Sequence, residues 1–159
     1  MRKRLLPFLL SLLCLLLFAC TKSTDGATPA ALAGQLRENL SARGVLILAD
    51  DDFYVLNFPD APTPAESVVF CSGTAPTTEF GIFRLESEKD AEKTKEAVRE
   101  YLESEKESRA SLARLYPSDD AGEDCARLEN AFFGRRGKTV YYFIGDSENT
   151  ARAKEILEP

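Results

Sequence analysis

Hydrophobic positions near the start of the folded part of the chain repeat with helical spacing. Leu32, Leu36 and Leu40 lie four residues apart, which predicts an amphipathic helix over residues 30–40. Thr28, which is followed by a proline, suits the N-cap position of that helix. The N-terminal part of the domain is therefore expected to contribute one helix with a single apolar face.

Three later segments have the composition and alternation of β-strands. Residues 66–72 and 78–86 are short and partly β-branched, and the turn between them contains glycine and proline, so they are predicted to pair as a hairpin. Residues 138–145 form the most strongly β-patterned segment. Tyr141 and Phe143 share one face of it, and we expect a helix to cover that face, although an exposed aromatic surface for a partner is the alternative.

A long, highly charged segment separates the second and third of these strands. Ser87 is a good N-cap and Pro117 cannot continue a helix, so a helix is predicted over residues 88–116. Its apolar stripe is expected to consist of Ala91, Thr94, Val98, Tyr101 and Leu102, and to resume at Leu112 and Leu115. The charges between these positions form a solvated face.

The remaining segments are shorter. A helix is predicted over residues 125–132 and a turn over residues 134–137, and Asp146 or Ser147 is expected to cap a final helix. Residues 45–58 fit either a strand or a turn of helix, so their conformation is left open. Together the segments predict an α+β fold. A small antiparallel sheet of about three strands packs against the long helix, with flanking N- and C-terminal helices.

The first twenty residues follow a different pattern. Basic residues 2–4 precede a run of 16 mostly apolar residues over positions 5–20, as in a secretory signal. At about 1.5 Å per residue this run reaches roughly 24 Å, whereas a bilayer core is about 30 Å thick. A retained transmembrane helix is therefore disfavoured.

Leu17, Phe18, Ala19 and Cys20 together resemble the lipobox of bacterial lipoproteins. The resemblance implies that Cys20 receives a diacylglyceryl thioether and becomes N-terminal after cleavage. Two acyl chains anchor a protein stably, whereas one gives only marginal binding. Phe18 departs from the commonest residue at its position, and a plainly secreted chain is the alternative.

These features divide the chain into three parts. Residues 1–19 are expected to be the signal peptide, 20–29 a flexible polar tether and 30–159 one globular domain, held on the extracytoplasmic face of the cell membrane. Three of the 20 basic residues and none of the 26 acidic residues precede Cys20, so the remaining chain carries a net charge of −9. This charge disfavours nucleic acid and anionic lipid as partners.

The chain contains no histidine. The absence excludes Ser-His-Asp and Cys-His nucleophile arrangements, His-ligated zinc and a histidine general base. Chemistry would have to use carboxylates, Lys, Tyr or Cys, and no cofactor is predicted. Cys71 and Cys125 remain once Cys20 is lipidated. They could form a disulfide that contributes about 4 kcal/mol, but two separate buried thiols are the favoured interpretation.

Residues 67–159 resemble the DUF4358 family, a domain of unknown function common in lipoproteins of Firmicutes, notably clostridia. The resemblance rests on order and spacing: residues 79–83, the long charged helix, Tyr116-Pro117, residues 128–131, Gly137 and the aromatic strand. It implies a lipoprotein with a compact fold, and it implies no reaction and no role for the cysteines.

Glu79, Tyr116 and Asn130 are the positions at which a functional site would be sought. Their ordinary interpretations are a charge at a strand end, a core aromatic residue and a surface amide. Residues 50–52 and 119–124 are acidic and could hold calcium, but a solvated turn and helix capping explain them better.

The leading functional hypothesis is a membrane-tethered, non-catalytic module that binds an envelope protein, a glycan or a small ligand. The alternative is an envelope enzyme that acts on glycans through paired carboxylates, which requires two acids in one cleft about 5–10 Å apart. A calcium-stabilised envelope protein is a third hypothesis.

Overall fold

The computed structural model describes residues 26–41, 46–50, 52–74 and 76–159. The predicted signal peptide and Cys20 lie outside these residues. The elements in chain order are α2 (Pro29–Asn39), β1 (Leu46–Leu48), α3 (Phe53–Asn57), β2 (Glu66–Ser72), β3 (Glu79–Arg84), α4 (Glu88–Leu115), α5 (Asp119–Glu129), β4 (Phe132–Arg136), β5 (Thr139–Ile144) and α6 (Ser147–Leu157).

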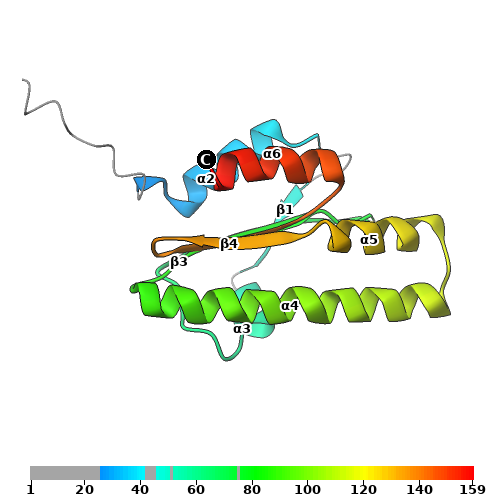
Figure 1. The fold of residues 1–159 in the computed structure, drawn as a ribbon, viewed down its shortest axis with the longest axis horizontal. Helices are drawn as coiled ribbons and strands as arrows, with labels where there is room; N and C mark the ends of the chain where they lie inside the picture. Colours follow the sequence, from blue (N-terminus) through cyan, green and yellow to red (C-terminus); the bar gives the residue numbers. More distant parts are fainter. Residues whose placement is uncertain (1–25, 42–45, 51, 75) are drawn as a thin grey trace, which may run out of the picture.

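The strands form one antiparallel sheet in the order β1-β2-β3-β5-β4. Helices α2 and α6 cover one face, and α4 and α3 cover the other, while α5 extends beyond the end of the sheet beside the second half of α4 (Figure 1). The predicted α+β class is therefore confirmed, as are the three predicted strands and the β2–β3 hairpin.

The structure adds two strands, β1 and β4, to the three that were predicted. The open segment 45–58 contains β1 followed by the short helix α3. The predicted helix 125–132 is wrong in its bounds, because the Ser118 side chain caps α5 from Asp119 onward and Phe132 already belongs to β4. The predicted turn over 134–137 is also wrong, since only Gly137, with φ 57°, and Lys138 form the turn.

Glycine at position 134 leaves room for the side chain of Tyr141, its pairing partner on β5. A Cβ atom at this position would lie 2.5 Å from the Tyr141 hydroxyl oxygen, so a larger residue would force the aromatic side chain out of place. Gly134 therefore continues a strand here, although the two glycines and two arginines together had suggested a turn.

Both faces of the sheet are buried. Tyr142 and Val140 pack with Val98 and Leu102 of α4, whereas Tyr141 and Phe143 pack beneath α2 and α6. The aromatic face of β5 is thus covered by helices. Alternation along one strand supplies two separate cores, and this explains why β5 is hydrophobic at every position from Val140 to Ile144.

The long helix α4 begins after Ser87, whose hydroxyl accepts the Asp90 N–H, and ends at its C-cap Tyr116, as predicted. The predicted continuation of its apolar stripe is wrong: Leu112 is 47% exposed, Leu115 71% and Tyr116 74%. The second half of α4 packs mainly against the short helix α5 rather than the sheet, and α5 leaves these side chains uncovered (Figure 1).

Candidate functional site

A groove of about 680 Å³ lies between α5 and the start of α6. Its lining is mainly polar and comes from three helix ends: Ser41 after α2, Glu123, Ala126, Arg127 and Asn130 from α5, and Asp146, Ser147, Glu148 and Asn149 from α6. The volume falls within the range of small-ligand sites, which is about 300–1,000 Å³.

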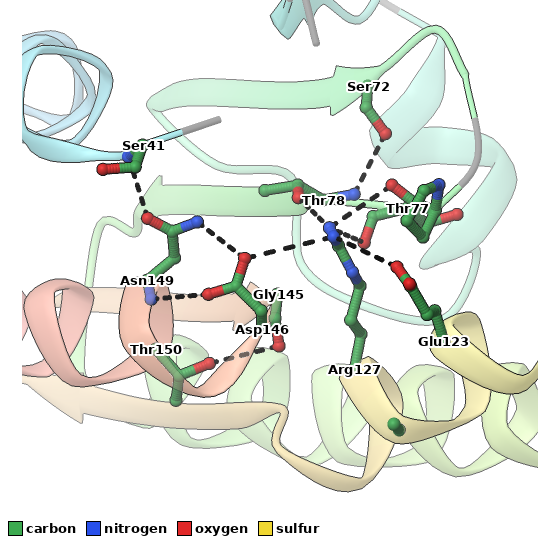
Figure 2. Close-up of polar contacts among 12 residues, drawn as sticks. Ser41, Ser72, Thr77, Thr78, Glu123, Arg127, Gly145, Asp146, Asn149 and Thr150 are labelled. Carbon is green, nitrogen blue, oxygen red and sulfur yellow. Dashed lines mark hydrogen bonds and ion pairs between the residues drawn. The ribbon is translucent and has the colours of Figure 1, made fainter. Parts of the chain in front are cut away.

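Arg127 forms the wall of the groove nearest the sheet. Its Nη1 donates to Thr78 Oγ1 at 2.6 Å and to the carbonyl oxygens of Thr77 and Pro76 at 3.2 and 3.3 Å. Because the side chain is only 11% exposed, these bonds are shielded from water and fix the loop between β2 and β3 to α5. Figure 2 shows the guanidinium among these groups.

The other nitrogen of the guanidinium faces the acidic side chains of the groove. Arg127 Nη2 lies 4.0 Å from Glu123 Oε2 and 4.0 Å from Asp146 Oδ2. Both distances are too long for hydrogen bonds but short enough for electrostatic attraction. Both carboxylates therefore approach the same nitrogen of Arg127, and these two oxygens are separated by at most twice that distance (Figure 2).

The first turn of α6 is fixed by its own side chains. Asp146 Oδ1 accepts the Asn149 N–H at 2.8 Å, and Asp146 Oδ2 accepts Asn149 Nδ2 at 2.9 Å. Asn149 Oδ1 in turn accepts the backbone N–H of Ser41 at 2.9 Å (Figure 2). Asn149 is 2% exposed, so this chain of bonds joins the end of α2 to α6 from the interior.

The groove is negatively charged on balance. Among the described residues of the lining, Glu123, Asp146 and Glu148 contribute three carboxylates, and Arg127 is the one cation. Arg152, one turn further along α6, pairs with Glu148 at 2.6 Å and offsets part of this charge. The arrangement favours a ligand with a positive group, because Glu123 and Glu148 remain more than half exposed.

A second polar cluster lies inside the fold, beneath α4. Glu79 is 8% exposed, and its Oε1 accepts the hydroxyl of Tyr142 at 2.7 Å and that of Tyr101 at 2.8 Å. Burial raises the pKa of Glu79 above its usual range, although both hydrogen bonds oppose the rise. Burial also raises the pKa of Tyr101 and of Tyr142, and the neighbouring Glu79 adds to both shifts.

The structure separates the three residues singled out in the sequence. Glu79 is buried under α4, Tyr116 is exposed at the end of α4, and Asn130 caps α5 and lines the groove. Within the described residues no hydrogen bond joins any two of them. The sequence analysis missed the main residues of the groove wall, Arg127 and Asn149. No local pattern in the sequence marks them.

The remaining candidates have simpler environments. Cys71 and Cys125 are free, partly buried thiols, and burial raises the pKa of Cys71. Asp124 is buried, where it accepts the Thr77 N–H and pairs with Arg109. Across the described parts of the chain, no group of three or more Cys, Asp or Glu side chains is arranged to hold a metal ion.

Comparison of the chain with family models, curated proteins and solved structures finds no match. The resemblance to the DUF4358 family therefore stays a prediction. No helix within the described residues is both long and apolar enough to cross a membrane.

Proposed function

We propose that this chain is a bacterial lipoprotein, anchored through Cys20 on the extracytoplasmic face of the cell membrane, with a non-catalytic binding module as its folded part. The α5–α6 groove is the proposed binding site. The observation that carries this proposal is the fixed geometry of its walls: Arg127, Asp146 and Asn149 are each held by several hydrogen bonds or ion pairs. A wall that is already ordered loses little conformational entropy when a ligand binds.

The chemistry of the groove favours a polar ligand that carries an amine. Glu123 and Glu148 are exposed carboxylates on facing helices, and Asn130 and Ser147 offer uncharged hydrogen-bonding groups between them. Peptides of the cell envelope with free amino groups have this chemistry, whereas a phosphate or an acidic glycan would meet three carboxylates. The predicted partners, an envelope protein, a glycan or a small ligand, are thereby narrowed to those with a positive group.

An enzyme acting on glycans is the second candidate, because Glu123 and Asp146 share one groove. Their separation, at most twice 4.0 Å, is compatible with the carboxylate pairs of glycosidases. However, the Arg127 guanidinium occupies the space between them, which is where a glycosidic bond would have to lie. This favours binding over hydrolysis.

The test uses the full chain purified in neutral detergent, with two probes from peptidoglycan: stem peptides with free amines and glycan strands without peptides. We expect calorimetry to show that the protein binds the stem peptides. Replacing both Glu123 and Glu148 by Gln should weaken binding about five- to thirtyfold, because two exposed charges contribute about 1–2 kcal/mol together. The matched control replaces Glu129 and Glu155, exposed on the same two helices but outside the groove lining.

The outcomes separate the two candidates. If the control variant loses as much peptide affinity as the groove variant, the groove is not the binding site. Release of reducing sugar ends from the glycan strands, abolished by Asp146→Asn, would replace the binding proposal with the enzymatic one. Asn is chosen because it keeps the N-cap of α6.

A further inference from the structure

The two edges of the sheet differ in how they are protected. At one edge, β4 carries Arg135 and Arg136, and Arg135 pairs with Glu92 at 3.0 Å and with Glu88 at 3.8 Å. Charged residues of this kind prevent another strand from adding to an edge. At the other edge, β1 has the sequence Leu-Ile-Leu and no charged residue.

The backbone of β1 has hydrogen-bonding groups directed outward. Ala49 N–H donates to Val69 O, so Ala49, and by alternation Ile47, form the hydrogen-bonded pairs with β2. The N–H and C=O groups of Leu48 therefore point away from β2, to the side of β1 on which the described residues place no further strand. This geometry is the one that β-strand addition uses.

An apolar surface accompanies this edge. We call Ile47, Val55 and Leu56, on the α3 side of the sheet, the apolar edge patch; they are 52%, 64% and 76% exposed. Leu48 is 60% exposed on the opposite face, beside its β2 partner Phe70. Leu48 and Val55 also line a cavity of about 260 Å³ between β1, α3 and the start of β2, whose floor includes Phe53 and Tyr54. A side chain from an added strand could enter this cavity, whose lining mixes apolar residues with Asp50, Thr63 and Ser67.

The charges around the patch restrict what can occupy it. Asp50, Asp52 and Asp60 are exposed, and Asp50 lines the cavity. On the opposite face of the sheet, Arg37 lies over the Phe70 ring. On the α3 side, residues 45–83 contain no lysine or arginine. A second copy of the chain would bring the same acids together, and an anionic bilayer would be repelled. A basic partner gains from the same charges.

We propose that the β1 edge binds an extended segment of another polypeptide, with apolar side chains on one face and lysine or arginine on the other, as an added strand of the sheet. The backbone of Leu48 would supply the hydrogen bonds, the apolar edge patch would receive the apolar side chains, and the exposed aspartates would attract the basic ones. This site is separate from the α5–α6 groove.

The probe is a blocked nine-residue peptide in which valine alternates with lysine, labelled for fluorescence anisotropy and mixed with the full chain in neutral detergent. Two comparison peptides carry either a central proline or glutamate in place of lysine. Leu48→Pro removes the outward N–H without touching the pairing with β2. Leu56→Ser changes the patch alone, and Leu115→Ser, at an equally exposed leucine of α4, is the matched control.

We expect the lysine peptide to bind, and both comparison peptides and Leu48→Pro to weaken binding at least about tenfold. Leu56→Ser should also weaken it, with melting unchanged, and Leu115→Ser should not. No binding of the lysine peptide, or equal binding of the proline peptide, overturns the proposal. If the wild type self-associates and Leu48→Pro does not, the edge binds a second copy of the chain instead. If the wild type binds vesicles and Leu56→Ser does not, the edge binds a bilayer instead.

Discussion

Glu79 combines deep burial with an ionisable group, and this combination sets how the stability of the fold depends on pH. Both tyrosine hydroxyls bond to Oε1, and within the described residues no buried side-chain oxygen or nitrogen lacks a partner, so Oε2 reaches solvent. Burial raises the pKa of the folded state above the ordinary 4.5. As pH rises through this window, the unfolded chain loses its proton first, and the folded state loses stability.

Glu79→Gln is therefore expected to stabilise the protein at neutral pH. The amide oxygen can accept both tyrosine hydroxyls and the NH₂ group can reach water, while the cost of burying a charge disappears. Thermal melting should rise by a few degrees at pH 7, and the difference from the wild type should vanish below about pH 4. A variant that melts lower than the wild type at pH 7 would contradict this account.

Glu79 was found from sequence because an acidic residue at the end of an apolar strand stands out locally. Arg127 and Asn149 could not be found in this way. Arg127 bonds to Thr78, 49 positions earlier, and Asn149 bonds to Ser41, 108 positions earlier. Such contacts follow from how the helices pack, and single-sequence patterns report only on neighbours along a helix or strand.

At the scale of elements, the sequence predicted what local chemistry determines. Ser87 and Asp146 cap α4 and α6, and Thr28 caps α2, because each side chain satisfies a free N–H in its own first turn. The edge strand β4 was missed, and β1 was left open, for the opposite reason. They are short, and pairing with β2 and β5 rather than their own composition makes them strands.

Helix α5 holds the loop between β2 and β3 in place through hydrogen bonds from Arg127 and to Asp124. Arg127→Lys keeps the positive charge but cannot donate to several acceptors in one plane. We expect the free energy of unfolding to fall by roughly 1–2 kcal/mol and hydrogen exchange at the Thr77 and Thr78 amides to accelerate. Arg114→Lys on the exposed end of α4 is the control. Unchanged exchange in the loop would show that Asp124 alone holds it.

At the scale of the whole molecule, the predicted lipid anchor and the negative charge act together. A domain with net charge −9 after cleavage gains nothing from an anionic membrane surface, so the lipid on Cys20 would be the main attachment. The structure does not describe Cys20, and the anchor rests on the lipobox resemblance.

Cys20→Ala is expected to block lipidation and lipoprotein-type cleavage. Membrane fractionation and mass spectrometry of the product measure both effects, and Cys14→Ala is the matched control because that residue lies within the leader. A Cys20→Ala protein that is still processed and still sediments with membranes would contradict the lipoprotein assignment.

The position of Ala27 has a mechanical consequence. Arg84 Nη2 donates to the Ala27 carbonyl at 2.9 Å, and Arg84 lies on β3, which has two strands on each side of it. A pull on the N-terminal end would therefore reach the domain beside its innermost strand, and α2 would have to separate from α6, β2 and β3 before β1, the strand that follows it, is loaded. If the chain is anchored through Cys20 as proposed, the packing of α2 would protect the edge strand β1 from a force on the tether.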